Sequence, residues 1–138
     1  MEQYHGTNTN NATNLASGFV DVTQGGGELG QGFYTGDLMH EAFNWAWHQY
    51  QRDKAVVQFT IPDAGFLALN VYCPDIHATQ RYRGLIRANG ETRTYLFHKD
   101  AIWAPVVGKH FSNFNQIKFE SKRSENFING GTVTKTVI

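Results

Sequence analysis

Two short motifs near the start of the sequence combine residue types that suit the binding of a flat ring attached to a sugar. The first reads Tyr-His-Gly-Thr at residues 4–7, the second reads Gly-Phe-Tyr-Thr at residues 32–35, and Trp45 follows Tyr34 by eleven residues. A histidine ring nitrogen can pair with a sugar hydroxyl, while a glycine lets the main chain approach a planar ring. A tyrosine and a second aromatic side chain can enclose that ring. These residues predict a site for a nicotinamide riboside.

Three elements around the motifs are expected to position them. A short strand over residues 2–6 carries the histidine, and a loop over residues 24–32, with five glycines among its nine residues, leads into the second motif. Asp37 is expected to cap a helix that runs to about residue 51, carries Trp45 and has apolar residues on two adjacent faces. The loop lacks the lysine of a P-loop and no helix follows it at the required place, which disfavours a P-loop NTPase.

The rest of the sequence is rich in strand patterns. Alternation of apolar and polar residues predicts strands over residues 55–61 and 115–121. Apolar or β-branched stretches predict further strands over residues 19–22, 66–73, 102–107 and 132–138, with a turn over 62–65. Short helices are expected within residues 7–17, capped by Asn10 or Asn11, and within 122–127. Residues 76–88 read either as a helix or as part of a hairpin that turns at Asn89-Gly90. This order predicts an α+β fold with residues 1–138 as a single domain.

The composition narrows the classes of function. Twelve basic and twelve acidic side chains balance, so no bulk charge draws the chain to nucleic acid or to a membrane. Cys73, the one cysteine, is expected to be buried and has no internal disulfide partner, which suits a reducing compartment. The six histidines lack metal-ligand spacing, so no metal is expected. The polar N-terminus and the lack of a long apolar run favour a protein without a membrane partner that is cytoplasmic or is delivered into the cytoplasm of a target cell.

The motifs and their order resemble the ADP-ribosyltransferase superfamily, in the diphtheria-toxin and poly(ADP-ribose) polymerase-like branch that carries a His-Tyr-Glu triad. The likeness is greatest to small bacterial toxin-type members, and the specific matches lie in the first 47 residues. The resemblance implies two small, mainly antiparallel sheets that form a cleft for NAD, with a helix beside it. It implies that NAD is a co-substrate rather than a resident cofactor.

The resemblance also assigns roles to the motif residues. His5 would hydrogen-bond the ribose hydroxyls of the adenosine half of NAD, and the main chain of Gly6 would hold the nicotinamide carboxamide. Tyr34 would stack on the nicotinamide, with Trp45 as the second aromatic residue. The NAD-binding set also includes two threonines of the motifs. Thr7 would support His5 or the ribose, and Thr35 follows Tyr34.

Two residues of the strand expected over residues 115–121 are candidates for the third catalytic position. In the family, a residue at the start of this strand contacts the ribose 2′-hydroxyl, and Gln116 fits that register best. A glutamine can hydrogen-bond the hydroxyl, but it brings no full negative charge and cannot act as a general base. The alternative is Glu120, which lies about 13 Å further along the same face, so the two cannot share the role. Outside that role, Glu120 is expected to be a solvated carboxylate.

The resemblance implies a mono-ADP-ribosyltransferase that modifies a protein or a nucleic acid and acts as a bacterial toxin or effector. An antitoxin or immunity protein would be its partner. Two alternatives remain: an NAD glycohydrolase, in which water is the acceptor, and a catalytically inactive module that binds NAD or nucleic acid. An arginine-specific transferase is disfavoured, because its Glu-x-Glu pair reads Lys118-x-Glu120 here.

Overall fold

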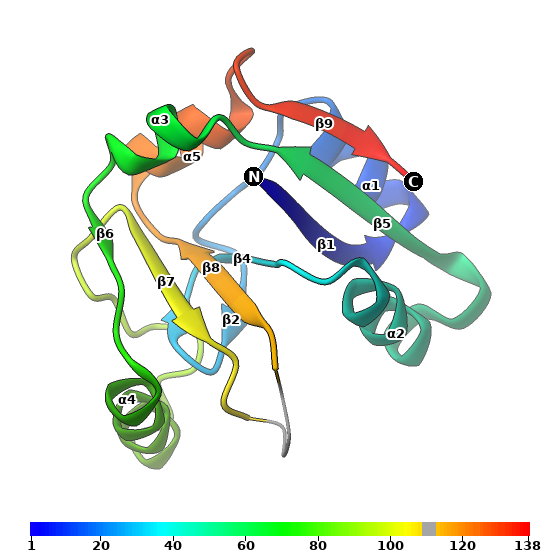
Figure 1. Ribbon diagram of the computed structural model, residues 1–138. Coiled ribbons are helices and arrows are strands. Elements are labelled where there is room, and N and C mark those ends of the chain that lie inside the picture. Colours follow the sequence, from blue (N-terminus) through cyan, green and yellow to red (C-terminus); the bar gives the residue numbers. More distant parts are fainter. Residues whose placement is uncertain (109–112) are drawn as a thin grey trace.

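The computed structural model describes residues 1–108 and 113–138 and has an α+β fold, as the sequence predicts (Figure 1). Within those residues, the strands form a seven-stranded mixed sheet in the order β6-β7-β8-β4-β1-β5-β9 and a small antiparallel β2-β3 pair. The strands are β1 (Glu2–Asn8), β2 (Gly26–Gly27), β3 (Gly30–Gln31), β4 (Phe33–Gly36), β5 (Lys54–Thr60), β6 (Val71–Tyr72), β7 (Ala101–Pro105), β8 (Asn115–Phe119) and β9 (Thr134–Val137). The helices are α1 (Thr9–Ala16), α2 (Met39–Tyr50), α3 (Asp63–Leu67), α4 (Ile76–Ala88) and α5 (Lys122–Asn129), with a 3₁₀ turn, η1 (Gln51–Asp53), after α2.

The large sheet is divided at its centre, between β1 and β4. These strands pair at Tyr4 and Gly36 and then diverge, whereas β1 pairs with β5 along its whole length. The expectation of two separate small sheets is therefore corrected to a large sheet with two halves, β6-β7-β8-β4 and β1-β5-β9. The physical reason is the short β1–β4 ladder, which joins the halves at one end and lets them separate at the other (Figure 1).

Glycine at the centre of β1 allows α2 to lie directly on that strand. A Cβ atom at Gly6 would lie 2.3 Å from the main-chain oxygen of Ala42 and 3.2 Å from the Cβ atom of Ala46. Both alanines belong to α2, and Ala46 is fully buried. The strand that carries the first motif and the helix that carries Trp45 are therefore held against each other by a residue without a side chain.

The main hydrophobic core is shared by the two halves of the large sheet. It combines side chains of β5, β4, β8 and α5, among them Val57, Phe59, Phe33, Ile117, Phe119 and Ile128. Ile117 and Phe119 point into this core, so the alternation expected for residues 115–121 is correct. A smaller cluster of Leu29, Ile102 and Ala104 lies near the β2-β3 pair, with Tyr34 packed against it.

Two stretches do not form the elements that the sequence predicts, and in the first of them side chains of α5 accept hydrogen bonds from the main-chain amides. Residues 19–22 do not form a strand: the amide of Val20 donates to the Asn129 side chain, and the amide of Val22 donates to Glu125. Residues 62–65 begin the helix α3 rather than a turn, so only Val71–Tyr72 of the expected strand 66–73 pairs in the sheet.

Other differences concern helix ends and exposure. Residues 76–88 form α4, which begins after Asp75, and the alternative hairpin is therefore wrong. The side chain of Asn8, rather than Asn10 or Asn11, caps α1. Asp37 does not cap α2 but accepts hydrogen bonds from Asn115 at the start of β8. Cys73 is exposed rather than buried, and α2 buries one side around Ala46 rather than two faces.

Candidate functional site

A cleft of about 790 Å³ opens where the two halves of the large sheet diverge. Its lining combines β1, β4, the first part of the glycine-rich loop, α2 and the start of β8. The residues that the sequence assigns to NAD binding and to the preferred third position all lie on this lining: His5, Gly6, Thr7, Tyr34, Thr35, Trp45 and Gln116. The structure thus brings together residues from both ends of the sequence in one concave site.

His5 is half-buried in the cleft and forms a hydrogen bond with the main chain of the Gly-Phe-Tyr-Thr motif. Its Nδ1 atom lies 2.7 Å from the main-chain oxygen of Tyr34, and its ring stacks on Phe33 with centroids 4.5 Å apart. Burial lowers the pKa of His5, and the hydrogen bond to Tyr34 offsets this only in part. A carbonyl can only accept, so the neutral ring carries its hydrogen on Nδ1. Its Nε2 atom is therefore a hydrogen-bond acceptor, which suits a hydroxyl donor.

The Tyr34 side chain is fixed by the glycine-rich loop. Its hydroxyl donates to the main-chain oxygen of Gly30 at 2.6 Å and accepts from the amide of Leu29 at 3.2 Å. A Cβ atom at Gly27 would lie 2.8 Å from the ring carbon Cζ, so glycine is required there. Burial raises the pKa of Tyr34 more than the hydrogen bond from Leu29 lowers it. The phenol stays neutral, and the ring is suited to stacking rather than to proton transfer.

The two threonines of the motifs are buried and contribute to the frame of the cleft. Thr35 donates a hydrogen bond from Oγ1 to Oε1 of Gln3 at 2.9 Å, which joins β4 to β1 beside the point where the sheet divides. Thr7 lies opposite Ala55 in the β1–β5 ladder. These positions are consistent with support of the cleft wall, and the hydroxyl of Thr35 already has a protein partner.

Apolar side chains form an exposed rim on the cleft. Trp45 on α2 is 47% exposed and makes an edge contact with Tyr50 at 6.0 Å between ring centroids. Leu38 and Phe19, also exposed, lie on the same lining, and Phe19 is 72% exposed. Large exposed apolar groups that gather at a cavity are typical of a ligand site.

Gln116 lies at the start of β8 and is bonded to a residue that the sequence analysis missed. Its side-chain nitrogen donates to Oε1 of Glu28 at 2.5 Å and to the main-chain oxygen of Pro105 at 3.2 Å. Glu28 belongs to the glycine-rich loop, and its side chain is 14% exposed. Its position four residues before the second motif is the available sequence signal, but only the tertiary fold shows that it meets β8.

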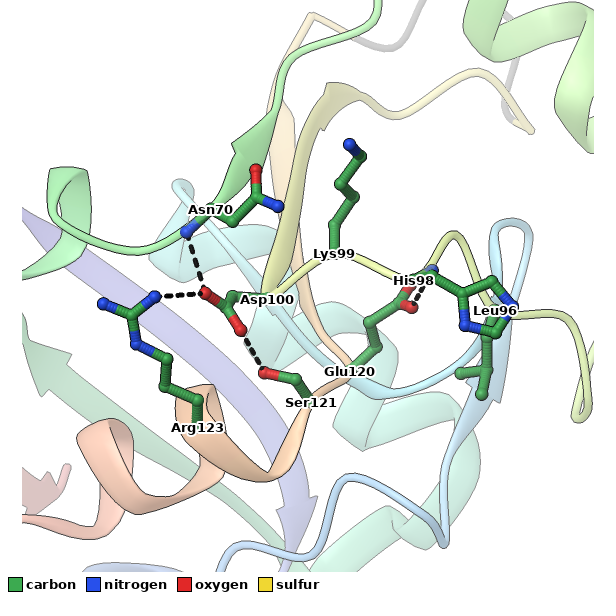
Figure 2. A pocket seen from close by; sticks show the side chains of 8 residues that line it. All are labelled: Asn70, Leu96, His98, Lys99, Asp100, Glu120, Ser121 and Arg123. Carbon is green, nitrogen blue, oxygen red and sulfur yellow. Dashed lines mark hydrogen bonds and ion pairs between the residues drawn. The ribbon is translucent and has the colours of Figure 1, made fainter.

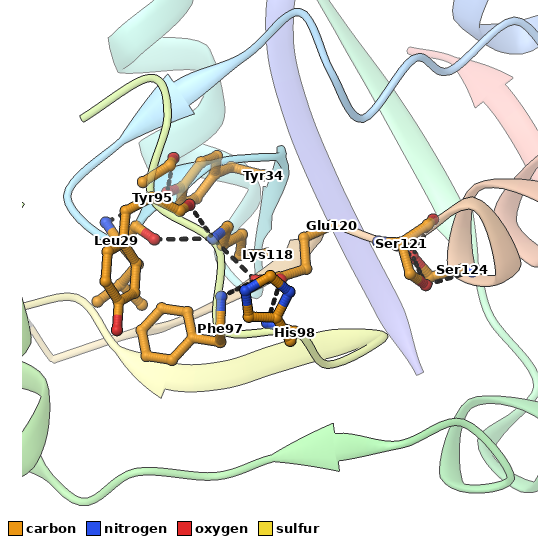
Figure 3. Close-up of polar contacts among 10 residues, drawn as sticks. Leu29, Tyr34, Tyr95, Phe97, His98, Lys118, Glu120, Ser121 and Ser124 are labelled. Atoms are coloured by element: carbon orange, nitrogen blue, oxygen red, sulfur yellow. Dashed lines mark hydrogen bonds and ion pairs between the residues drawn. The ribbon is translucent and has the colours of Figure 1, made fainter. Parts of the chain in front are cut away.

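Glu120 does not line the cleft and is not a solvated carboxylate. It forms a buried ion pair of 2.9 Å with Lys118, whose Nζ atom also donates to the main-chain oxygens of Leu29 and Tyr95 (Figure 3). Glu120 accepts from the amides of Phe97 and His98. Burial lowers the pKa of Lys118, and its bond to Glu120 opposes this shift. The pair therefore anchors two loops against β8.

A shallower depression on another part of the surface surrounds Asp100 (Figure 2). The Asp100 carboxylate accepts from the amide of Asn70, the hydroxyl of Ser121 and the guanidinium of Arg123. Burial would raise the pKa of Asp100, but these hydrogen bonds and the Arg123 charge outweigh it and lower the pKa. The arrangement ties β6, β7 and α5 together, so the Asp100 carboxylate has a structural role here.

Comparisons with known proteins assign no family to the chain. No protein-family model matches the chain, and no curated protein matches it in sequence. Among residues 1–108 and 113–138, no three or more side chains of the usual ligand types are placed to hold a metal ion. Over the same residues, no helix has the length and apolar character needed to cross a membrane. The functional argument therefore rests on the geometry of the cleft.

Proposed function

We propose that the cleft binds NAD and that the protein transfers ADP-ribose from NAD to a macromolecular acceptor, either a protein or a nucleic acid. The observation that carries the proposal is that His5, Tyr34 and Gln116, on three different strands, line the same cleft. The resemblance of the motifs to ADP-ribosyltransferases assigns catalytic roles to these same three residues. By the same resemblance, the protein would act as a toxin or effector with a neutralising partner protein.

The geometry supports a specific binding mode. The Nε2 atom of neutral His5 accepts a hydrogen bond from a ribose hydroxyl, because its Nδ1 hydrogen is used by Tyr34. The fixed ring of Tyr34 stacks on the nicotinamide, and Trp45 on the rim provides the second aromatic surface. The main chain at Gly6, on the cleft lining, holds the carboxamide.

The proposed reaction is a substitution at the anomeric carbon of the nicotinamide ribose. The bond between that carbon and the nicotinamide nitrogen breaks, and neutral nicotinamide leaves with the bonding electron pair. A nucleophile of the acceptor attacks the opposite face and loses its proton to solvent. Gln116 accepts a hydrogen bond from the 2′-hydroxyl, and this bond strengthens as positive charge develops on the ribose. Positioning of the reactants supplies most of the remaining rate enhancement.

The proposal is tested by incubating the protein with NAD labelled in its adenylate part and a cell lysate. Transfer places the label on material that either protease or nuclease releases, which identifies the class of acceptor. Release of nicotinamide with no labelled macromolecule would instead identify an NAD glycohydrolase. Binding without cleavage would indicate an inactive NAD-binding module, and the absence of both in folded protein would overturn the proposal.

Gln116→Ala is the matched variant for this assay. One hydrogen bond to a neutral hydroxyl contributes about 0.5–1.5 kcal/mol, so the affinity for NAD should change by a few-fold to about tenfold. Transfer should fall much more, because the lost bond acts mainly in the transition state. Equal losses of affinity and single-turnover rate would show that Gln116 binds NAD without a catalytic role.

A further inference from the structure

Glu28 is held in one position by three separate parts of the fold. Its Oε1 atom accepts from the Gln116 side chain and, at 2.9 Å, from the amide of Val107 after β7. Its Oε2 atom lies 3.5 Å from Nε of Arg83 on α4. A Cβ atom at residue 108 would lie 2.5 Å from the same Oε2 atom, so Gly108 allows the chain to close over the carboxylate. The glycine-rich loop therefore delivers a fixed charge to the cleft.

This carboxylate determines which end of the Gln116 amide accepts a hydrogen bond. A carboxylate and a main-chain oxygen are both acceptors, so the two partners of the amide nitrogen, Glu28 and Pro105, require the NH₂ group on their side. The Gln116 oxygen is then the atom that can accept from a hydroxyl. A hydrogen bond from the NH₂ group to a charged acceptor also polarises the amide and strengthens the oxygen as an acceptor.

We propose that Glu28 is the positioning residue of Gln116: it fixes the amide so that its oxygen accepts the hydrogen bond from the ribose 2′-hydroxyl during NAD cleavage. This inference rests on the proposed function of the cleft. Glutamine and glutamate together then perform what a single glutamate does in a His-Tyr-Glu site. The glutamine supplies the acceptor atom, and the glutamate supplies the orientation and the nearby negative charge.

The pair also explains why glutamate at position 116 would not improve the site. Gln116→Glu would place a second carboxylate within hydrogen-bond distance of Glu28. Two carboxylates this close cannot both ionise freely, and one must take up a proton at a pH where an isolated glutamate is charged. Single-turnover NAD cleavage by Gln116→Glu should therefore depend on pH across the acidic to neutral range, whereas cleavage by the unaltered protein should not show this ionisation.

The contact itself is tested without NAD by the Gln116 side-chain amide signals in the NMR spectrum of ¹⁵N-labelled protein. In the unaltered protein the hydrogens of this amide group should exchange slowly with water, because Glu28 and the main-chain oxygen of Pro105 both accept from it. In Glu28→Ala the signals should move and the exchange should be faster. Unchanged signals and unchanged exchange in Glu28→Ala would overturn the assignment of Glu28 as the residue that orients Gln116.

The catalytic consequence is tested by kinetics on three variants. Glu28→Ala should lower the single-turnover rate roughly 10- to 100-fold, as small misplacements of reacting groups do, with a change of a few-fold in NAD affinity. Glu28→Gln should recover most of that loss, because its side-chain oxygen still accepts from Gln116 and Val107. Asp63→Ala removes a carboxylate that does not line the cleft and that pairs with the N-terminal amine, and it should have no effect on the rate.

These outcomes separate the two proposals. If the unaltered protein cleaves NAD and Glu28→Ala cleaves it equally fast, the role of Glu28 is wrong and the proposed function stands. If the unaltered protein neither binds nor cleaves NAD, the proposed function is wrong and the role of Glu28 in cleavage falls with it. The amide signals still report whether Glu28 orients Gln116.

Discussion

His5 and Tyr34 are joined by a hydrogen bond of 2.7 Å between Nδ1 of the histidine and the main-chain oxygen of the tyrosine. The bond lies where β1 and β4 diverge beyond Tyr4 and Gly36. The His5 side chain thus donates to the main-chain oxygen of Tyr34 at the point where the β1–β4 ladder ends. The same bond selects the tautomer of His5, so a contact beside the division of the sheet also sets the hydrogen-bonding chemistry of the cleft.

The first prediction concerns the Nε2 atom of His5. In His5→Asn, the side-chain nitrogen can still donate to the oxygen of Tyr34, but the acceptor atom is lost. We expect the affinity for NAD to fall by the free energy of one net hydrogen bond, about 0.5–1.5 kcal/mol, with the fold retained. Titration calorimetry measures this change. An unchanged affinity in folded His5→Asn would remove His5 from the binding site.

The second prediction concerns pH. Burial lowers the pKa of His5 below the value of 6.5 that it has in an unfolded chain. The unfolded state therefore binds the proton more readily than the folded state. The stabilisation from neutral His5 is present in full above pH 6.5 and is lost as the pH falls toward the lower folded-state pKa. Denaturant titrations should show a decrease in the free energy of unfolding below this pH that is smaller in His5→Asn. Equal decreases would contradict the burial of neutral His5.

The third prediction concerns Gly6, whose bare backbone has a packing role whether or not it binds a ligand. Gly6→Ala forces α2 away from β1, because the new Cβ atom would meet the main-chain oxygen of Ala42. We expect the free energy of unfolding to fall by about 1–3 kcal/mol, as is typical of overpacking. Gly84→Ala on α4 is the control, since a Cβ atom there meets no atom of the described chain within 4 Å. It should be neutral or slightly stabilising.

The fourth prediction concerns the buried pair of Lys118 and Glu120. Lys118→Met leaves the Glu120 carboxylate buried without its partner, so we expect a loss of about 3–5 kcal/mol in the free energy of unfolding. Lys122→Met removes an exposed lysine that pairs with Glu125 and should change stability little. Thermal unfolding compares the two variants. Similar small effects would show that the buried pair does not anchor the loops.

Local patterns predicted the elements that depend on nearby residues. Alternation in residues 55–61 and 115–121 identified β5 and β8, because each strand has a face in the core and the period of a strand is visible in the sequence. The spacing of apolar residues also predicts the helix that carries Trp45. It does not predict how the helix begins, because the Asp37 carboxylate is used by Asn115, which lies far along the chain.

Contacts between distant segments were not visible in the sequence. Glu120 is predicted to be a solvated carboxylate, but it pairs with buried Lys118, and the glycine-rich loop and residues 95–98 supply the main-chain partners of both side chains. The strand expected at residues 19–22 is replaced by bonds to α5. Glu28 was missed for the same reason, since a carboxylate in a glycine-rich loop has no periodicity that would indicate its partner.

The most direct test of the proposed NAD cleft is a titration of NAD into ¹⁵N-labelled protein, followed by NMR. We predict saturable shifts concentrated on Gly6, Thr7, Tyr34, the Trp45 indole and the Gln116 side chain. Residues around the Asp100 cluster, such as Asn70 and Ser121, should keep their signals unchanged, because they lie outside the cleft. The absence of saturable shifts in folded protein, or shifts confined to residues outside the cleft, would contradict the account.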